Sequence, residues 1–316
     1  MDSGEIHVLN YTIKRLAQSA FAVFGVLTLL FFVQRLTGDP TMLLVPEGAT
    51  AEDIELIRIK LGFDRPLIVQ YLDYLRQLGT FSLGDSIVQK IPVWDILLSR
   101  LPYTVELTAG AMLLSIGIGL PIGVTMALFR GSALERILQG IVLTGQSMPT
   151  FFSGILLILL FAVHLGWLPS SGADSMQSLV MPAIALGMLS MATFARVARN
   201  AVLDELSKDY VRTAKAKGVP YARIVFKHLT RNSAIPVITV AALEISHLLA
   251  GAVIVETMFA WPGLGQVAVQ AINSRDFPIV QSVVLLGSVA TVVCNLLADV
   301  LYCVVDPRIS LQGANA

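Results

Sequence analysis

Four acidic residues inside apolar stretches are the first candidates for chemistry in this sequence. They are Glu106, Glu244, Glu256 and Asp299. A charged side chain costs about 3 kcal/mol at the centre of a bilayer, so such residues commonly line a solute path or pair with another polar group. If they pair, Glu244 would bond His247, one helical turn along, and Asp299 would likewise bond Asn295. Both interpretations stay open.

The second candidate is a basic connection, residues 196–234, with nine basic and three acidic side chains. A helix over 208–217 would carry small residues on one face and basic residues on the next. The small face holds Val211, Ala214 and Gly218, and the basic face holds Lys208, Arg212 and Lys215. Gly218 and Pro220 predict a break and a second helix to about Leu229. The first helix could dock on a protein or rest on anionic lipid.

Enzyme motifs are scarce. The sequence lacks GxxxxGKS/T and HExxH, so neither a self-contained nucleotide site of that type nor that metal site is predicted. Cys294 and Cys303 form no ligand pattern, and we interpret them as small apolar residues. Ser153 and His247 could form an intramembrane hydrolase dyad, but no GxSG surrounds the serine. A secondary transporter is a further alternative, disfavoured because no inverted repeat is visible.

The elements that position these residues are apolar segments. Of 316 residues, 55% are hydrophobic and 14% are charged, whereas soluble domains carry about 25% charged residues. Lysine plus arginine equals aspartate plus glutamate at 22 each, which gives no indication of a nucleic-acid partner. Six stretches are long enough to cross a bilayer, which predicts an all-α membrane protein. They are residues 16–36, 105–129, 137–165, 179–195, 235–255 and 279–304.

Basic residues in the short flanks predict that both termini and the connection 196–234 are cytoplasmic. The long loop 37–100 then lies outside, and its nine acidic residues outnumber six basic ones. Amphipathic patterns at 51–61 and 66–78, separated by Gly62, predict a folded external element with two helices.

The decapeptide 209–218 reads Asp-Tyr-Val-Arg-Thr-Ala-Lys-Ala-Lys-Gly. It resembles the EAA loop of permease subunits in binding-protein-dependent ABC importers, in the form typical of the oligopeptide, dipeptide and nickel branch. Thr230 and Arg231 stand where the general form of this loop has Leu-Pro. Further matches follow in family order: Gly38-Asp39-Pro40, Gly84-Asp85-Ser86, Ser147-Met148-Pro149, residues 256–265 and Arg275-Asp276-Phe277-Pro278.

This resemblance implies the type I ABC importer permease fold, with six transmembrane helices and an external helical insertion after the first. The implied organisation is an N-terminus with the first helix (1–36), the insertion (37–100), a five-helix core (101–306) with the coupling loop 196–234, and a tail (307–316). The residues implied to couple the chain to an ATPase are Arg212, Thr213, Ala214, Lys215 and Gly218.

The implied partners are two ATPase subunits, an extracytoplasmic solute-binding protein and a second homologous permease, which makes a heterodimer. ATP and Mg would be bound by the ATPase subunits, with no cofactor in this chain. The implied location is a bacterial or archaeal inner membrane. The expected solute is a di- or oligopeptide, and nickel, glutathione, an opine or a sugar are the alternatives.

Overall fold

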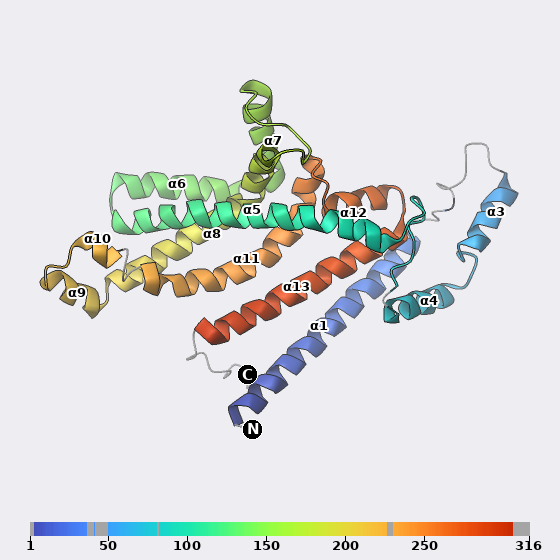
Figure 1. Cartoon of the computed structure of the whole chain (residues 1–316), viewed down its shortest axis with the longest axis horizontal. Coiled ribbons are helices and arrows are strands. Elements are labelled where there is room, and N and C mark those ends of the chain that lie inside the picture. Colours follow the sequence, from blue (N-terminus) through green and yellow to red (C-terminus); the bar gives the residue numbers. More distant parts are fainter. Residues whose placement is uncertain (1–2, 37–40, 42–49, 81, 226–229, 306–316) are drawn as a thin grey trace. The chain divides into compact units, whose positions relative to one another are not determined.

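The computed structural model describes residues 3–36, 41, 50–80, 82–225 and 230–305. Their regular elements are helices, and the one bridge among them joins Asp85 to Pro92. Figure 1 shows the whole chain, which divides into two compact units. Unit 1 comprises Met1–Pro102 and Gly263–Ala290, and unit 2 comprises Tyr103–Pro262 and Thr291–Ala316.

Unit 1 contains α1 (Ser3–Leu36), α3 (Ala51–Lys60), α4 (Leu67–Gly79), α12 (Leu264–Asn273) and the first parts of α5 (Val93–Leu128) and α13 (Phe277–Val305). Its core packs Val93 and Leu97 of α5 against Val267 of α12 and Ile279 of α13. The two helices predicted in the loop 37–100 are thus α3 and α4, with Gly62 at φ +72° between them. No residue of α3 is buried.

Unit 2 contains the rest of α5, then α6 (Ala133–Ser147), α7 (Thr150–Leu157), the π-helix η1 (Ile158–His164), α8 (Met176–Leu206), α9 (Asp209–Ala216), α10 (Tyr221–Arg223) and α11 (Thr230–Met258). Helix α8 is central, since it contacts α6, α7 and α11 (Figure 1). It lies so close to α5 that a Cβ on Gly119 or Gly123 would come within 2.6 or 2.3 Å of α8 carbonyl oxygens. Small residues permit this approach, as is common between membrane helices.

Five described helices are long and apolar enough to cross a membrane. Their apolar segments are Ala17–Leu36, Val93–Leu128, Met176–Leu206, Pro236–Met258 and Phe277–Ala298. The predicted span 137–165 is present as a bent pair, because the chain bends by 108° between α6 and the helix formed by α7 and η1. Met148 precedes Pro149 and is extended (φ −83°, ψ 125°), as expected before a proline, so the helix ends there and a new one begins. Counting the bent pair as one span makes six.

Candidate functional site

Helix α9 lies in the basic connection predicted to carry the coupling residues. Lys208 is its N-cap, and Gly218 at φ +73° follows its end, so the predicted helix and break are both present. Val211 is 1% exposed and belongs to a cluster with Ala127, Val202, Ile224 and Val225, which we call the loop cluster. Helix α10 starts after Pro220, and residues 226–229 of the predicted second helix lie outside the described residues.

The two faces of α9 differ in exposure. Ala214 is half-buried and packs on the loop cluster, whereas Arg212, Thr213 and Lys215 are exposed. Val211 and Ala214 therefore face the chain's own core instead of an outside surface, because burying them removes apolar area from water. The surface that α9 offers to a partner is its polar and basic side.

Two carboxylates that the sequence analysis missed hold the ends of the helices near α9. Glu205, on the last turn of α8, accepts a hydrogen bond from the Tyr210 hydroxyl at 2.6 Å and pairs with Lys208. Glu135, at the start of α6, pairs with Arg199 of α8 at 2.5 Å and is 8% exposed. Ser132 followed by Glu135 is a helix-start pattern that could have drawn attention to the second of these.

Two of the predicted path residues join helices. Glu256 is fully buried on α11 and accepts a hydrogen bond from the Thr104 hydroxyl of α5 at 2.6 Å. Glu244, half-buried on α11, accepts one from Ser190 of α8 at 2.5 Å. The predicted bond between Glu244 and His247 is not found between these two described side chains, and His247 is exposed. Both carboxylates are therefore held by hydroxyl donors on neighbouring helices.

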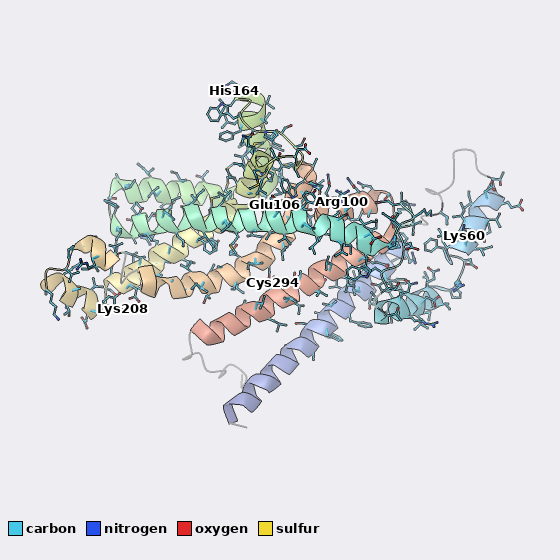
Figure 2. All side chains as sticks on the ribbon, in the orientation of Figure 1. Lys60, Arg100, Glu106, His164, Lys208 and Cys294 are labelled. Carbon is cyan, nitrogen blue, oxygen red and sulfur yellow. The ribbon has the colours of Figure 1, made fainter. Side chains whose placement is uncertain are left out.

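The remaining candidates have different surroundings. Glu106 is exposed on α5, well away from Lys208 within unit 2 (Figure 2). The side chain of Asp299 lies outside the described residues, and so does its predicted bond to Asn295. Asn295 accepts a hydrogen bond from Ser246 at 3.2 Å. Among the described residues no group of three or more His, Cys, Asp or Glu side chains could hold a metal ion.

The sequence matches two family models that together span most of its length. Residues 119–311 match the model described as binding-protein-dependent transport system inner membrane component, and residues 8–108 match the model of its N-terminal region. The chain belongs to this family. It is the permease subunit of an ABC importer of the peptide and nickel branch, and a multi-pass protein of the inner membrane.

Curated relatives are similar to this chain over nearly its whole length. It is 42% identical over 303 residues to the glutathione transport system permease protein GsiC of Escherichia coli O6:H1, covering 96% of this chain and 99% of the relative. The proteins of the same name from E. coli K12 and Salmonella typhi are 41% and 40% identical, with the same coverage.

The fold is also that of a solved permease. The inward-facing MetNI methionine ABC transporter matches with a TM-score of 0.58 at 22% identity, covering 67% of this chain and 96% of that one. The predicted type I importer fold is thereby confirmed. The family is a membrane permease and not the catalytic subunit of the transporter.

Proposed function

We propose that α9 couples this permease to ATP hydrolysis, because its exposed residues dock on an ATPase subunit. The exposed docking residues are Arg212, Thr213, Lys215 and Gly218, and the half-buried Ala214 contributes to coupling by packing α9 on the loop cluster. The observation that carries the proposal is the division of α9 into a buried face and an exposed basic face. The buried face fixes the helix to this chain, and the exposed face leaves charged groups available to a partner.

The contacts of α9 suggest how movement would spread. Val211 packs with Val202 of α8 and Ala127 of α5, so a displacement of α9 acts directly on the ends of two long helices. Helix α8 in turn contacts α6, α7 and α11. Closure of the ATPase subunits would then move these helices as a packed group, which is a rigid-body transition of the kind that switches transporters.

The remaining parts of the transporter follow from this role. Two ATPase subunits bind ATP and Mg, an external solute-binding protein delivers the solute, and a related permease completes the path as a heterodimer. Both termini and the loop 196–234 are cytoplasmic, and the insertion 37–100 is external, because basic residues are concentrated in the former. The core 101–306 forms this chain's half of the path.

The solute is proposed to be a short peptide. The relatives named above carry glutathione in their names, and glutathione is a small peptide, which favours this class. Nickel is the second candidate of the branch.

Of the path residues, Glu244 is the better candidate because it is only half-buried, whereas full burial of Glu256 favours a role in holding α5 and α11 together. Glu106 and Asp299 remain candidates.

The test is a charge reversal on the exposed face of α9, Arg212→Glu with Lys215→Glu, in the complete transporter in proteoliposomes. The expected result is at least a ten-fold loss of ATPase stimulation by the solute-binding protein, since like charges facing each other cost several kcal/mol. Lys90→Glu reverses an exposed charge in unit 1 and is the control. Unchanged stimulation and unchanged assembly of the double variant would contradict the docking role.

A further inference from the structure

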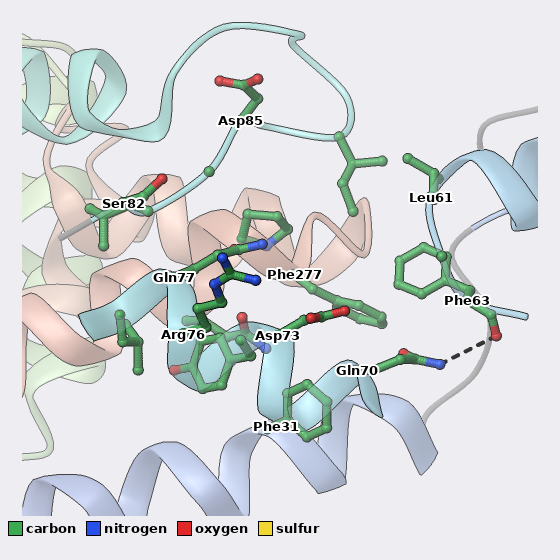
Figure 3. Close-up of a pocket in the computed structure, with 18 of the residues that line it drawn as sticks. Phe31, Leu61, Phe63, Gln70, Asp73, Arg76, Gln77, Ser82, Asp85 and Phe277 are labelled. Carbon is green, nitrogen blue, oxygen red and sulfur yellow. Dashed lines mark hydrogen bonds between the residues drawn. The ribbon is translucent and has the colours of Figure 1, made fainter. Parts of the chain in front are cut away.

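A cavity of about 530 Å³ lies in unit 1 (Figure 3), and no coupling or path candidate is among its lining residues. Its walls are the end of α1, the turn after α3, helix α4, the segment 82–87 and the start of α13. The volume falls within the range of small-ligand sites. The cavity lies mostly within the insertion that we predict to be external.

Two polar groups of α4, one helical turn apart, lack hydrogen-bond partners among the described residues. Gln70 is 9% exposed, and its amide nitrogen donates to the carbonyl oxygens of Phe63 at 3.3 Å and Arg65 at 2.8 Å (Figure 3). These two bonds orient the amide, so its Oε1 is left as an acceptor. The second group is the buried hydroxyl of Tyr74.

Tyr74 can act as a donor at neutral pH. Burial, with a smaller contribution from Tyr71, raises the pKa of Tyr74 to about 12. Its hydroxyl therefore keeps its proton across the physiological range. Together, Gln70 and Tyr74 are complementary to a ligand that offers one hydrogen-bond donor and one acceptor.

The lining is basic although the surrounding loop is acidic. Four of its ionisable side chains are basic and two are acidic: Arg35, Lys60, Arg65 and Arg76, against Asp73 and Asp85. Arg65 pairs with Asp73 at 3.2 Å, and the Arg76 side chain extends from α4 into the centre of the view in Figure 3. Net positive charge in a partly enclosed site favours an anionic ligand group.

An aromatic wall completes the cavity. Phe31 and Phe277 line it together with Phe63. The guanidinium of Arg35 lies 5.0, 4.5 and 5.1 Å from the ring centroids of Phe31, Phe63 and Phe277, respectively. Such contacts hold the cation in place. Phe31 and Phe277 are buried, so the half-buried ring of Phe63 is the apolar surface left for a side chain of the ligand.

We propose that this cavity binds the carboxylate end of a short peptide. The carboxylate accepts hydrogen bonds from Tyr74 and Arg76, the last peptide N–H donates to Gln70 Oε1, and the terminal side chain lies against the ring of Phe63. The carboxylate and the N–H donor follow from the cavity itself, whereas the choice of a peptide rests on the solute class proposed above.

The ligand-side test uses the full-length permease with its partner permease in phosphatidylcholine nanodiscs, without binding protein or nucleotide. Calorimetry compares the tripeptide Ala-Ala-Phe with its C-terminal amide. The expected result is saturable binding of the free acid and about ten-fold weaker binding of the amide, because charge-assisted bonds are lost. No saturable binding of the acid, or equal affinity for both peptides, would overturn the proposal.

The protein-side test uses Tyr74→Phe, which removes only the hydroxyl, and Arg76→Gln, which removes the guanidinium with its charge and its hydrogen-bond donors. Each is expected to weaken binding of Ala-Ala-Phe about ten-fold, since each loses a hydrogen bond to a charged group. Arg58→Gln, which neutralises an arginine that does not line the cavity, is the matched control. Variants that elute as folded complexes and bind like this control would refute the assignment.

The experiments distinguish a wrong assignment of the peptide cavity from a wrong assignment of the coupling role of α9. The double variant Arg212→Glu, Lys215→Glu should bind Ala-Ala-Phe with unchanged affinity, because α9 does not line the cavity. Loss of peptide binding with intact coupling in the Tyr74 and Arg76 variants would support the cavity assignment alone. Retained peptide binding with intact coupling in the α9 variant would refute only the docking role.

Discussion

The carboxylate of Asp276 accepts a hydrogen bond from the hydroxyl of Ser86 at 2.5 Å, although the two residues are 190 positions apart. The same carboxylate accepts backbone N–H bonds from Ile87 at 3.1 Å and Val88 at 3.2 Å, and it is 1% exposed. It thereby ties the segment before α5 to the turn between α12 and α13.

Replacing this carboxylate should loosen unit 1. In Asp276→Asn, one oxygen becomes an amide nitrogen that faces N–H or O–H donors, so we expect a loss of about 2–3 kcal/mol. Thermal unfolding of the purified permease, followed by circular dichroism, measures the effect as a lower midpoint. Asp85→Asn, at an exposed neighbouring position, should leave the midpoint unchanged. Equal midpoints for Asp276→Asn and the wild type would contradict the role given to this carboxylate.

The close contact of α5 and α8 predicts that alanine substitutions of two glycines of α5 have opposite effects on stability. A Cβ on Gly123 would lie 2.3 Å from the Ala195 carbonyl oxygen, so Gly123→Ala must push the helices apart, at a cost of about 1–3 kcal/mol. A Cβ on Gly117 meets nothing within 4 Å, and Gly117→Ala should stabilise α5 by about 0.5–1 kcal/mol. Unfolding midpoints that shift in the same direction for both variants would refute the packing.

Substitutions of Gly218 distinguish an effect of backbone conformation from an effect of steric space. A Cβ there meets nothing within 4 Å, yet φ is +73°, where a β-branched residue is strained by about 1–2 kcal/mol. We expect Gly218→Val to lower solute-stimulated ATPase activity, and Gly218→Asn, which tolerates this conformation, to retain most of it. If both variants lose activity equally, contact with the partner and not backbone strain limits this position.

The buried hydrogen bond between Thr104 of α5 and Glu256 of α11 predicts that substitutions of two threonines differ in their effect on stability. Thr104→Val removes a donor to the buried Glu256 carboxylate, so about 1–3 kcal/mol of stability should be lost. Thr108→Val is the matched control, because within the described part of the chain that hydroxyl bonds only the Thr104 carbonyl of its own helix. The measurement is the fraction of permease that stays monodisperse after heating. Equal losses for the two variants would argue against a special role for the Glu256 bond.

Much of the helical architecture could be predicted from local sequence. A run of about 20 apolar residues can be identified as a membrane helix without knowledge of its contacts, because the free energy of its transfer into hydrocarbon depends on that segment alone. The helix at 209–216 and its end at Gly218 were predictable for a similar reason, since glycine readily adopts the left-handed conformation that stops a helix. The size of the bend at Pro149 could not be predicted from the sequence, because the apolar run continues through it.

The sequence by itself determined that this chain is a helical membrane permease with a basic loop ending at Gly218, since apolar runs, charge asymmetry and ordered motifs are properties of neighbouring residues. Tertiary structure decided which face of α9 turns inward, which donors reach Glu244, Glu256 and Asp276, and that Gln70 and Tyr74 share one cavity. These relationships depend on contacts between segments far apart in the chain. Spacing within one segment specifies a face, but only packing against another segment specifies what that face meets.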